Sequence, residues 1–348
     1  MKIQIAVILL FVSVAIRAQQ LSVTTCGADP LGVQDSTAAF KTCLAKAPAG
    51  DVLVPTGSYR ITSPIVKSRN QGLVGQGSKA SILLCQNTTE PCLIAADTTG
   101  GPNNYAVSNI ENLGLQGTGS GIGILLGGDP ANVLIANTAF GDSVDLVDLR
   151  ITGFTYGVEW GNNAYINKIE RCLFFGNVSG LYAAGGLSNS GEAISVTDST
   201  VFNNRNYGIE DHANFEWFIR GSSLCYNAWA AVLFYGATVH ISNAHIEQQE
   251  ATVVSQPYGY GNLSIKDSTI LIQATTGSDQ YLLSTWPQSL NLSIDNVLIY
   301  SNHPVTYFMH VQGSVNGTIS NLYGNGNKKI AALWNTAGNV VLTAVQTF

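Results

Sequence analysis

Charged side chains are scarce in this chain. Asp, Glu, Lys and Arg make up only 11% of its 348 residues, whereas soluble globular proteins carry roughly 25%. The 16 Lys and Arg residues form no basic run, and the formal net charge is −6. Because a phosphate backbone has to be neutralised by clustered cations, we expect no nucleic-acid partner.

Long hydrophobic runs are also missing from most of the sequence. After the N-terminal region, no apolar segment reaches the about 18 residues that a membrane-spanning helix needs. At the N-terminus, Lys2 precedes an apolar run from Ile5 to Ile16, and the small residue Ala18 follows, which is the order of a secretory signal peptide. We therefore predict a signal peptide over residues 1–18, a secreted mature chain, extracellular or periplasmic, and no membrane span.

Motifs that bind metals or cofactors are absent as well. The five histidines are dispersed, with no His-Glu-x-x-His motif and no paired Cys-x-x-Cys. We therefore predict neither a metal nor a cofactor. The six cysteines fit an oxidising compartment. Cys26 with Cys43 and Cys85 with Cys92 are the pairs that local spacing allows, although the sequence leaves the pairing open.

Glycine and hydrophobic residues, in contrast, are abundant, and the hydrophobic ones recur with a period. The chain has 36 Gly and is 45% hydrophobic. Segments such as "ISVTDSTVFNN", "VHISNAHIEQQ" and "LSIDNVLIYSN" share one pattern, in which an apolar anchor is followed five residues later by another apolar residue. Such a repeat outranks local propensity. The anchors lie 22 to 36 residues apart, at Ile110, Leu146, Ile169, Val196, Ile219, Ile241, Ile265, Ile294 and Ile319.

Each repeat predicts three short strands. Between the first two lies a bend residue that tolerates a left-handed backbone, namely Asp148, Asp198, Gly221, Asn243, Asp267, Asn296 or Asn321. A third strand such as "YGVEW" or "YGIED" follows and places Val158, Leu181, Ile209, Val232 and Val253 inward. Stacked coils of this kind predict an all-β fold, a right-handed parallel β-helix, because each coil buries its apolar residues against its neighbours.

The segment before these coils carries a resemblance to a known family. "CGADPLGVQDSTAAFKTCLAKAPAGDVLVPTGSYRI", from Cys26 to Ile61, resembles the N-terminal motif of the pectate-lyase-like superfamily, which includes rhamnogalacturonase-like and epimerase-like proteins and phage tailspikes. Asp35 or Ser36 can cap a helix near residues 35–47 that closes the end of the solenoid. We expect the cap and first coils over 19–106 and further coils over 107–348, in a single domain.

The resemblance implies a polysaccharide-active protein without specifying its reaction. The tripeptide motifs of polygalacturonases and the calcium ligands of pectate lyases have no counterpart here. The preferred hypothesis is a glycoside hydrolase of acid–base type acting on a polysaccharide or oligosaccharide. The alternatives are a polysaccharide lyase of the pectate-lyase type, whose uronate carboxylate Arg220, Arg171 or Lys168 neutralises, and a non-catalytic glycan-binding or adhesive solenoid. A homo-oligomer is left open.

The stretch "YGIEDHANFEW" concentrates acids in a chain that otherwise has few. Side chains alternate between the two faces of a strand, and Ile209 is predicted to point inward. Glu210 and His212 are therefore expected to point outward, and Asp211 toward the body of the solenoid. The same alternation places Glu159, Tyr182, Glu210 and Leu233 at equivalent outward positions of successive coils, in one column along the stack. We predict Glu210, Asp211 and Glu159 as catalytic candidates. Substrate contacts are predicted at His212, Trp217, Arg220, Tyr182 and Tyr235.

A second acid and histidine pair offers an alternative site. His245 and Glu247 both point outward by the same alternation, but on a different strand of the coil. We therefore expect the two clusters to lie in separate grooves.

Overall fold

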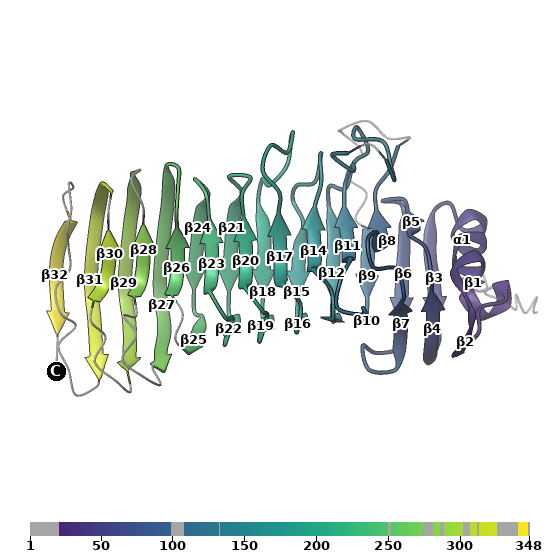
Figure 1. Cartoon of the computed structure of the whole chain (residues 1–348), viewed down its shortest axis with the longest axis horizontal. Helices are drawn as coiled ribbons and strands as arrows, with labels where there is room; N and C mark the ends of the chain where they lie inside the picture. Colours follow the sequence, from purple (N-terminus) through teal and green to yellow (C-terminus); the bar gives the residue numbers. More distant parts are fainter. Residues whose placement is uncertain are drawn as a thin grey trace, which may run out of the picture.

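The chain winds into a long stack of coils with a helix at its N-terminal end (Figure 1). The structure is a computed structural model that describes residues 21–98, 108–131, 133–249, 252–273, 281–285, 289–301, 307–311, 313–325 and 340–346. The predicted signal peptide lies outside these residues, and the predicted boundary near residue 107 adjoins residues that are not described. None of the helices in the described ranges is long and apolar enough to cross a membrane.

One face of the stack is a ten-stranded sheet made of the third strand of each coil. All its described pairings are parallel. Its strands, in spatial order, are β5 (Ile65–Lys67), β8 (Pro91–Ala95), β11 (Ile122–Leu126), β14 (Tyr156–Trp160), β17 (Ser179–Ala183), β20 (Tyr207–Asp211), β23 (Ala230–Phe234), β26 (Thr252–Gln256), β28 (Tyr281–Thr285) and β30 (Tyr307–Val311).

The other two strands of each coil belong to a 22-stranded sheet. Its first column contains β1 (Leu21–Ser22), β3 (Gly50–Val54), β6 (Gln71–Gly75), β9 (Ser108–Glu111), β12 (Val144–Val147), β15 (Lys168–Glu170), β18 (Ile194–Thr197), β21 (Glu216–Arg220) and β24 (Thr238–Ser242). Its second column contains β2 (Leu31–Asp35), β4 (Gly57–Ile61), β7 (Ser81–Cys85), β10 (Gly114–Gln116), β13 (Arg150–Thr152), β16 (Leu173–Phe175), β19 (Thr200–Phe202), β22 (Ser223–Cys225) and β25 (His245–Gln249). Toward the C-terminus single long strands cross both columns, namely β27 (Gly261–Gln273), β29 (Leu290–Ser301) and β31 (Val315–Asn325), and β32 (Val340–Gln346) pairs with the last of these.

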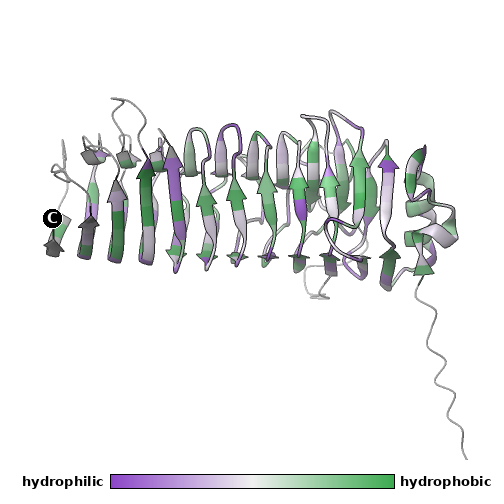
Figure 2. Ribbon diagram, turned by 90° about the horizontal axis from the view of Figure 1, so that it is seen from below, coloured by the Kyte–Doolittle hydropathy of each residue, from purple (hydrophilic) through white to green (hydrophobic). Residues whose placement is uncertain are grey.

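The predicted register of the repeat is confirmed. The nine anchors, from Ile110 to Ile319, pair in an unbroken series from β9 to β31. All nine are almost completely buried. The seven predicted bend residues all have a left-handed backbone, with φ between 47° and 58°. Hydrophobic side chains therefore fill the interior, and hydrophobic segments recur strand after strand (Figure 2).

The inward column of the third strands is confirmed with one correction. Val158, Leu181, Ile209 and Val232 pair in succession, but the next member is Val254 and not Val253. In the last two of these coils the inward residue of the third strand lies eight residues after that of the second, as Val232 does after Leu224 and Val254 after Ile246. The prediction had aligned the two strands one residue out of step.

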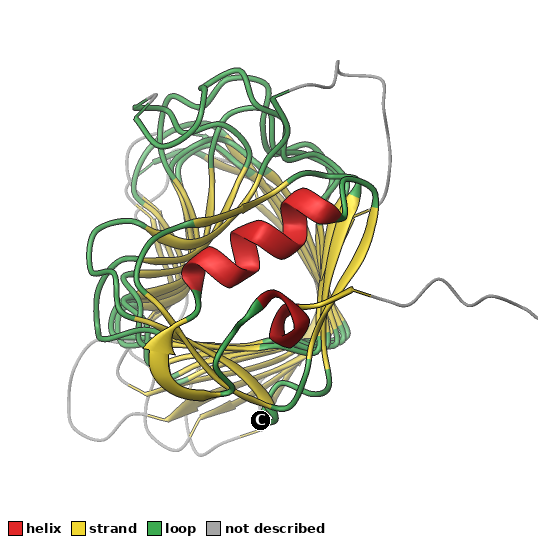
Figure 3. Cartoon of the chain, turned by 90° about the vertical axis from the view of Figure 1, so that its right-hand side faces the viewer, coloured by secondary structure: helices red, strands yellow, loops and turns green. Residues whose placement is uncertain are grey.

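The N-terminal helix α1 (Thr37–Lys46) lies across the open end of the coils, beside the short 3₁₀ helix η1 (Val23–Cys26) (Figure 3). Its N-cap residue, Ser36, makes no side-chain capping bond. A carboxylate oxygen of Asp35, one residue earlier, accepts a hydrogen bond of 3.0 Å from the Thr37 N–H. The buried helix face includes Phe40, Cys43 and Leu44. Two disulfides join Cys26 to Cys43 and Cys85 to Cys92, so both pairings that the spacing allowed are present.

A ladder of buried amides lies at the end of the second strand, or directly after it, in successive coils. The side-chain oxygen of each member accepts from the backbone N–H of the member before it, over distances of 2.9 to 3.3 Å. The members are Asn177, Asn204, Asn227 and Gln248, each at most 1% exposed. These bonds join neighbouring coils at a turn, where the strand ladders are interrupted.

Candidate functional site

The candidate site lies on the outward face of the ten-stranded sheet, over β14, β17, β20 and β23. Glu159, Tyr182, Glu210 and Leu233 pair in direct succession, which confirms the predicted column. Coils in a parallel sheet are spaced by about 4.8 Å. The backbones of Glu159 and Glu210, two coils apart, are therefore separated by about 10 Å.

Glycines allow the coils to approach closely at this face. A Cβ added at Gly157 would lie 2.5 Å from the Gly180 carbonyl oxygen, and one added at Gly208 would lie 2.6 Å from that of Ala231. Real Cβ atoms do not come this near to a backbone oxygen. The Gly in "YGVEW", "SGLYA" and "YGIED" is thus a packing requirement of the sheet that carries the carboxylates.

Glu210 is held by two neighbouring side chains. The Ser179 hydroxyl, one coil away on β17, donates to Oε2, and His212 Nε2 lies 2.8 Å from Oε1. The Glu210 side chain is 14% exposed and the His212 side chain 26%. Glu210 is therefore oriented from both sides and still open to solvent, as a base that activates water requires.

Glu159 has a different environment. It lines a pocket of about 290 Å³ together with apolar residues of β11 and of the loop that follows it, including Ile122, Leu125 and Leu134. Burial in this pocket raises the pKa of Glu159 to about 7, and the negative charge of Asp129 adds to the increase. A carboxyl group that keeps its proton near neutral pH has the property required of a general acid.

Aromatic rings surround the two carboxylates. The Tyr156 and Tyr182 rings are stacked with their centroids 3.7 Å apart, and the Tyr235 ring packs against His212 at 4.3 Å. Burial raises the pKa of Tyr207 to about 12, with a further contribution from the charge of Glu210. These tyrosines are consequently neutral hydroxyl donors on a flat, aromatic surface, which suits contact with sugar rings.

Several residues of this surface were not among the predicted site residues. Tyr156 begins a third strand with the pair Tyr-Gly, as Tyr207 of the acidic stretch does, a repeated signal that could have identified Tyr156. Trp229, 58% exposed, packs edge-on against Tyr207, and Tyr258, 61% exposed, adjoins Tyr235. Both lie in turns, where the strand period provides no signal.

Asp211 and Trp217 have no exposed surface. The Asp211 carboxylate accepts hydrogen bonds from the Trp217 indole N–H at 2.9 Å and from the backbone N–H groups of Ala213 and Phe215 at 2.6 and 3.0 Å. Burial raises its pKa, and these hydrogen bonds act in the opposite direction. In this structure the two residues fix the turn between β20 and β21, and neither can reach a sugar.

The remaining predicted residues lie on the 22-stranded sheet. Arg220 ends β21 and its guanidinium lies over the Phe218 ring at 5.7 Å. Arg171 follows β15 and pairs with Asp148 and Glu170. His245 and Glu247 are on β25. The structure thus brings together Glu159, Tyr182, Glu210, His212 and Tyr235, and separates these other residues from them.

Comparison with known proteins agrees with this architecture. A family model described as rhamnogalacturonase A/epimerase, pectate lyase-like, matches residues 20–231. No curated protein matches the chain by sequence.

Several solved structures share the fold. The catalytic unit of the thermostable GH87 alpha-1,3-glucanase from Streptomyces thermodiastaticus strain HF3-3 is 15% identical with a TM-score of 0.54, covering 94% of this chain and 68% of that one. DFA-IIIase from Arthrobacter chlorophenolicus A6 is 12% identical with a TM-score of 0.62, covering 92% and 86%. The enzymatically active domain of tailspike protein 4 of bacteriophage CBA120 is 18% identical with a TM-score of 0.61, covering 93% and 46%. Identities this low establish the fold alone.

Proposed function

The chain belongs to the rhamnogalacturonase A/epimerase, pectate lyase-like family, and from that premise we propose that it is a glycoside hydrolase that cleaves a polysaccharide or oligosaccharide by acid–base catalysis. The observation that carries the proposal is the pairing of two unlike carboxyl groups on one face. Glu159 lines a largely apolar pocket with its pKa raised to about 7, whereas Glu210 is partly exposed and hydrogen-bonded.

These environments suit two complementary roles. Glu159 donates its proton to the glycosidic oxygen as the bond to the anomeric carbon breaks. The Glu210 carboxylate takes a proton from the water that forms the new bond to that carbon. The backbone spacing of about 10 Å lies closer to the separation of about 6.5 to 9.5 Å in inverting enzymes than to the about 5 Å of retaining ones. We therefore propose inversion of the anomeric configuration.

The surroundings favour an uncharged glycan over a uronate. A lyase needs a cation beside the substrate carboxylate, yet β14, β17, β20 and β23 contain no Lys or Arg. The cations considered for that role, Arg220, Arg171 and Lys168, belong to the other sheet. Arg205, in the turn before β20, donates to the Gly119 carbonyl oxygen at 2.9 Å. The hydrolase is thus better supported than the lyase.

A test starts with a polysaccharide panel on which reducing ends and the absorbance of unsaturated uronates are measured together. We expect reducing ends without unsaturated product, and loss of activity by at least about a hundredfold in Glu210→Gln and Glu159→Gln. Glu216→Gln, which changes another acid of the same stretch but on β21, is the matched control and should stay active. Full activity in Glu210→Gln would reject the site, and loss in Glu247→Gln would transfer it to β25. No turnover by the unmodified chain on any glycan it binds would favour the non-catalytic alternative.

We also propose that the protein is secreted. The two disulfides support this, since such bonds persist in oxidising compartments. Sequencing the N-terminus of protein collected from the medium or periplasm should show a chain that begins at Gln19. Retention of residues 1–18 on protein inside the cell would contradict secretion.

A further inference from the structure

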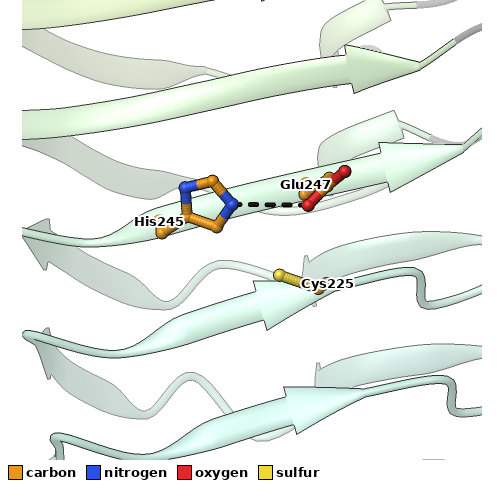
Figure 4. A group of neighbouring side chains, drawn as sticks. All are labelled: Cys225, His245 and Glu247. Carbon is orange, nitrogen blue, oxygen red and sulfur yellow. Dashed lines mark hydrogen bonds and ion pairs between the residues drawn. The ribbon is translucent and has the colours of Figure 1, made fainter.

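A second cluster of reactive side chains lies on the outward face of β22 and β25. Cys225 pairs directly with Glu247 across these strands, and His245 precedes Glu247 by two residues. One ligand atom from each of the three residues lies within 4.8 Å of the others. Figure 4 shows the three side chains on the same side of the two neighbouring strands.

The carboxylate of this cluster is held in place by two further groups. The Tyr226 hydroxyl and the Gln273 amide both donate to Glu247 Oε1. Oε2 is the oxygen turned toward His245. Outer partners that orient a carboxylate in this way are typical of metal sites, where they fix the ligand before the ion arrives.

The separation of the histidine and the glutamate fits a shared ion better than a direct hydrogen bond. His245 Nε2 lies 3.4 Å from Glu247 Oε2, whereas strong hydrogen bonds of this kind are about 2.7 to 2.9 Å long. Two ligands bound to a tetrahedral Zn²⁺ at about 2.0 to 2.1 Å are about 3.3 Å apart. Nitrogen and oxygen therefore already have the separation of two tetrahedral ligands.

We propose that Cys225, His245 and Glu247 bind a zinc ion, with water in the fourth position. A thiolate, an imidazole and a carboxylate form a donor set that suits Zn²⁺ and excludes Ca²⁺ and Mg²⁺, which prefer oxygen ligands alone. The His245 side chain is 46% exposed, so an ion can enter and a solvent ligand can remain.

Metal binding also accounts for the position of the thiol. Cys225 is only 8% exposed, and the strand pairing places it directly beside Glu247. A bound cation supplies the positive charge that stabilises the thiolate, and binding releases the thiol proton.

The test is a titration of the full-length mature chain with Co²⁺ and then Zn²⁺. We expect one equivalent of Co²⁺ to give a thiolate-to-metal charge-transfer band that Zn²⁺ abolishes. Cys225→Ser should remove the band, and His245→Ala and Glu247→Gln should weaken binding at least tenfold. Tyr226→Phe should weaken it about tenfold to a hundredfold, as expected for an outer partner. Cys172→Ser, which changes the other free cysteine, is the matched control and should keep the band.

The proposal is overturned if no saturable one-to-one binding occurs, or if Cys225→Ser binds with unchanged affinity and spectrum. Should Cys225→Ser fail to fold, the exposed His245→Ala variant decides, because its substitution leaves the core intact. The site is on a different sheet from Glu210, so zinc binding by Glu210→Gln separates this result from that of the glycan assay.

Discussion

Glu159 connects a local environment to a measurable pH dependence. Its carboxyl group has to be protonated to act as the acid, and its pKa is raised to about 7 by burial and by the charge of Asp129. We expect turnover to fall as the pH rises through about 7. Asp129→Asn removes the neighbouring charge, which lowers the pKa of Glu159 and moves this fall to lower pH. A pH–rate profile of both proteins checks the shift, and an unchanged alkaline limb would contradict the assignment.

The same carboxyl group should affect stability independently of catalysis. Its pKa in the folded state lies above the ordinary value of 4.5, so the folded protein loses stability as the pH rises from about 4.5 to about 7. Glu159→Gln cannot ionise and avoids this loss. We expect the variant to be more stable than the unmodified protein at about pH 9 and equal to it at about pH 4. A difference in melting temperature that is constant over this range would show that ionisation is not the cause.

Asp211 offers a test that distinguishes structure from catalysis. Its carboxylate accepts three hydrogen bonds and is completely buried. In Asp211→Asn at least one donor faces an amide NH₂ group, so we expect a loss of about 2 to 3 kcal/mol in the free energy of unfolding. Denaturant titration measures this. Unchanged stability together with lost turnover would restore Asp211 as a catalytic candidate.

Strand alternation predicted which carboxylates share a face, but not what surrounds them. The position of Glu210 follows from inward Ile209, and that of Glu159 from inward Val158. The burial of Trp217 follows from the same alternation, because Trp217 lies two residues before the anchor Ile219 on β21. Its hydrogen bond to Asp211 depends on the turn between β20 and β21, for which the repeat has no rule. The pocket of Glu159 is closed by residues that include Val133 and Leu134, more than 20 residues away in sequence. Contacts of that kind require the folded chain.

At the scale of the element, the amide ladder joins coils where the strands are interrupted. Asn204 accepts from the Asn177 backbone N–H and its side-chain amide, and donates to Asn227. Asn204→Ala leaves the buried Asn177 backbone N–H without its acceptor and removes one of the two hydrogen bonds to Asn227 Oδ1. We therefore expect a loss of roughly 1 to 3 kcal/mol in the free energy of unfolding. Asn206→Ala, in the same turn but outside the ladder, should change stability little. Equal effects of the two substitutions in chemical denaturation would contradict a special role for the ladder.

The strands and bends were predictable because they repeat with a simple chemistry, apolar inward and Asn, Asp or Gly at a left-handed bend. The sequence pattern did not reveal the ladder, although Asn177, Asn204 and Asn227 each stand at the end of a repeat segment, as Asn204 does in "ISVTDSTVFNN". An asparagine after a strand is usually explained as a turn former, and only burial reveals its other role. Asn177 also begins an Asn-Val-Ser sequon, but its amide is buried and hydrogen-bonded to Asn204.

At the scale of the whole molecule, one buried hydrophobic cluster extends from Val23 to Leu322. Ile241 is 1% exposed and pairs with the anchors of both neighbouring coils. Ile241→Asp places an unpaired charge in this stack, and we expect a loss above about 4 kcal/mol, a large part of the stability of a domain. Ser242→Asp adds the same charge one residue further on, facing outward, and should have little effect. Thermal unfolding of the two variants compares them directly, and similar melting temperatures would contradict the inward column.

In a solenoid, two residues at equivalent positions of different coils are separated by a whole number of coil spacings, or steps. Glu159 and Glu210 are two steps apart, with the coil of Tyr182 between them. Point mutations can tilt a side chain, but only the gain or loss of a complete turn can change the step number. Loss of the intervening turn would bring the carboxylates to about 5 Å, the separation found in retaining glycosidases. In such a scaffold the number of coils between the two carboxylates thus sets whether the anomeric configuration is inverted or retained. A single in-frame deletion of one coil would then change the stereochemical outcome.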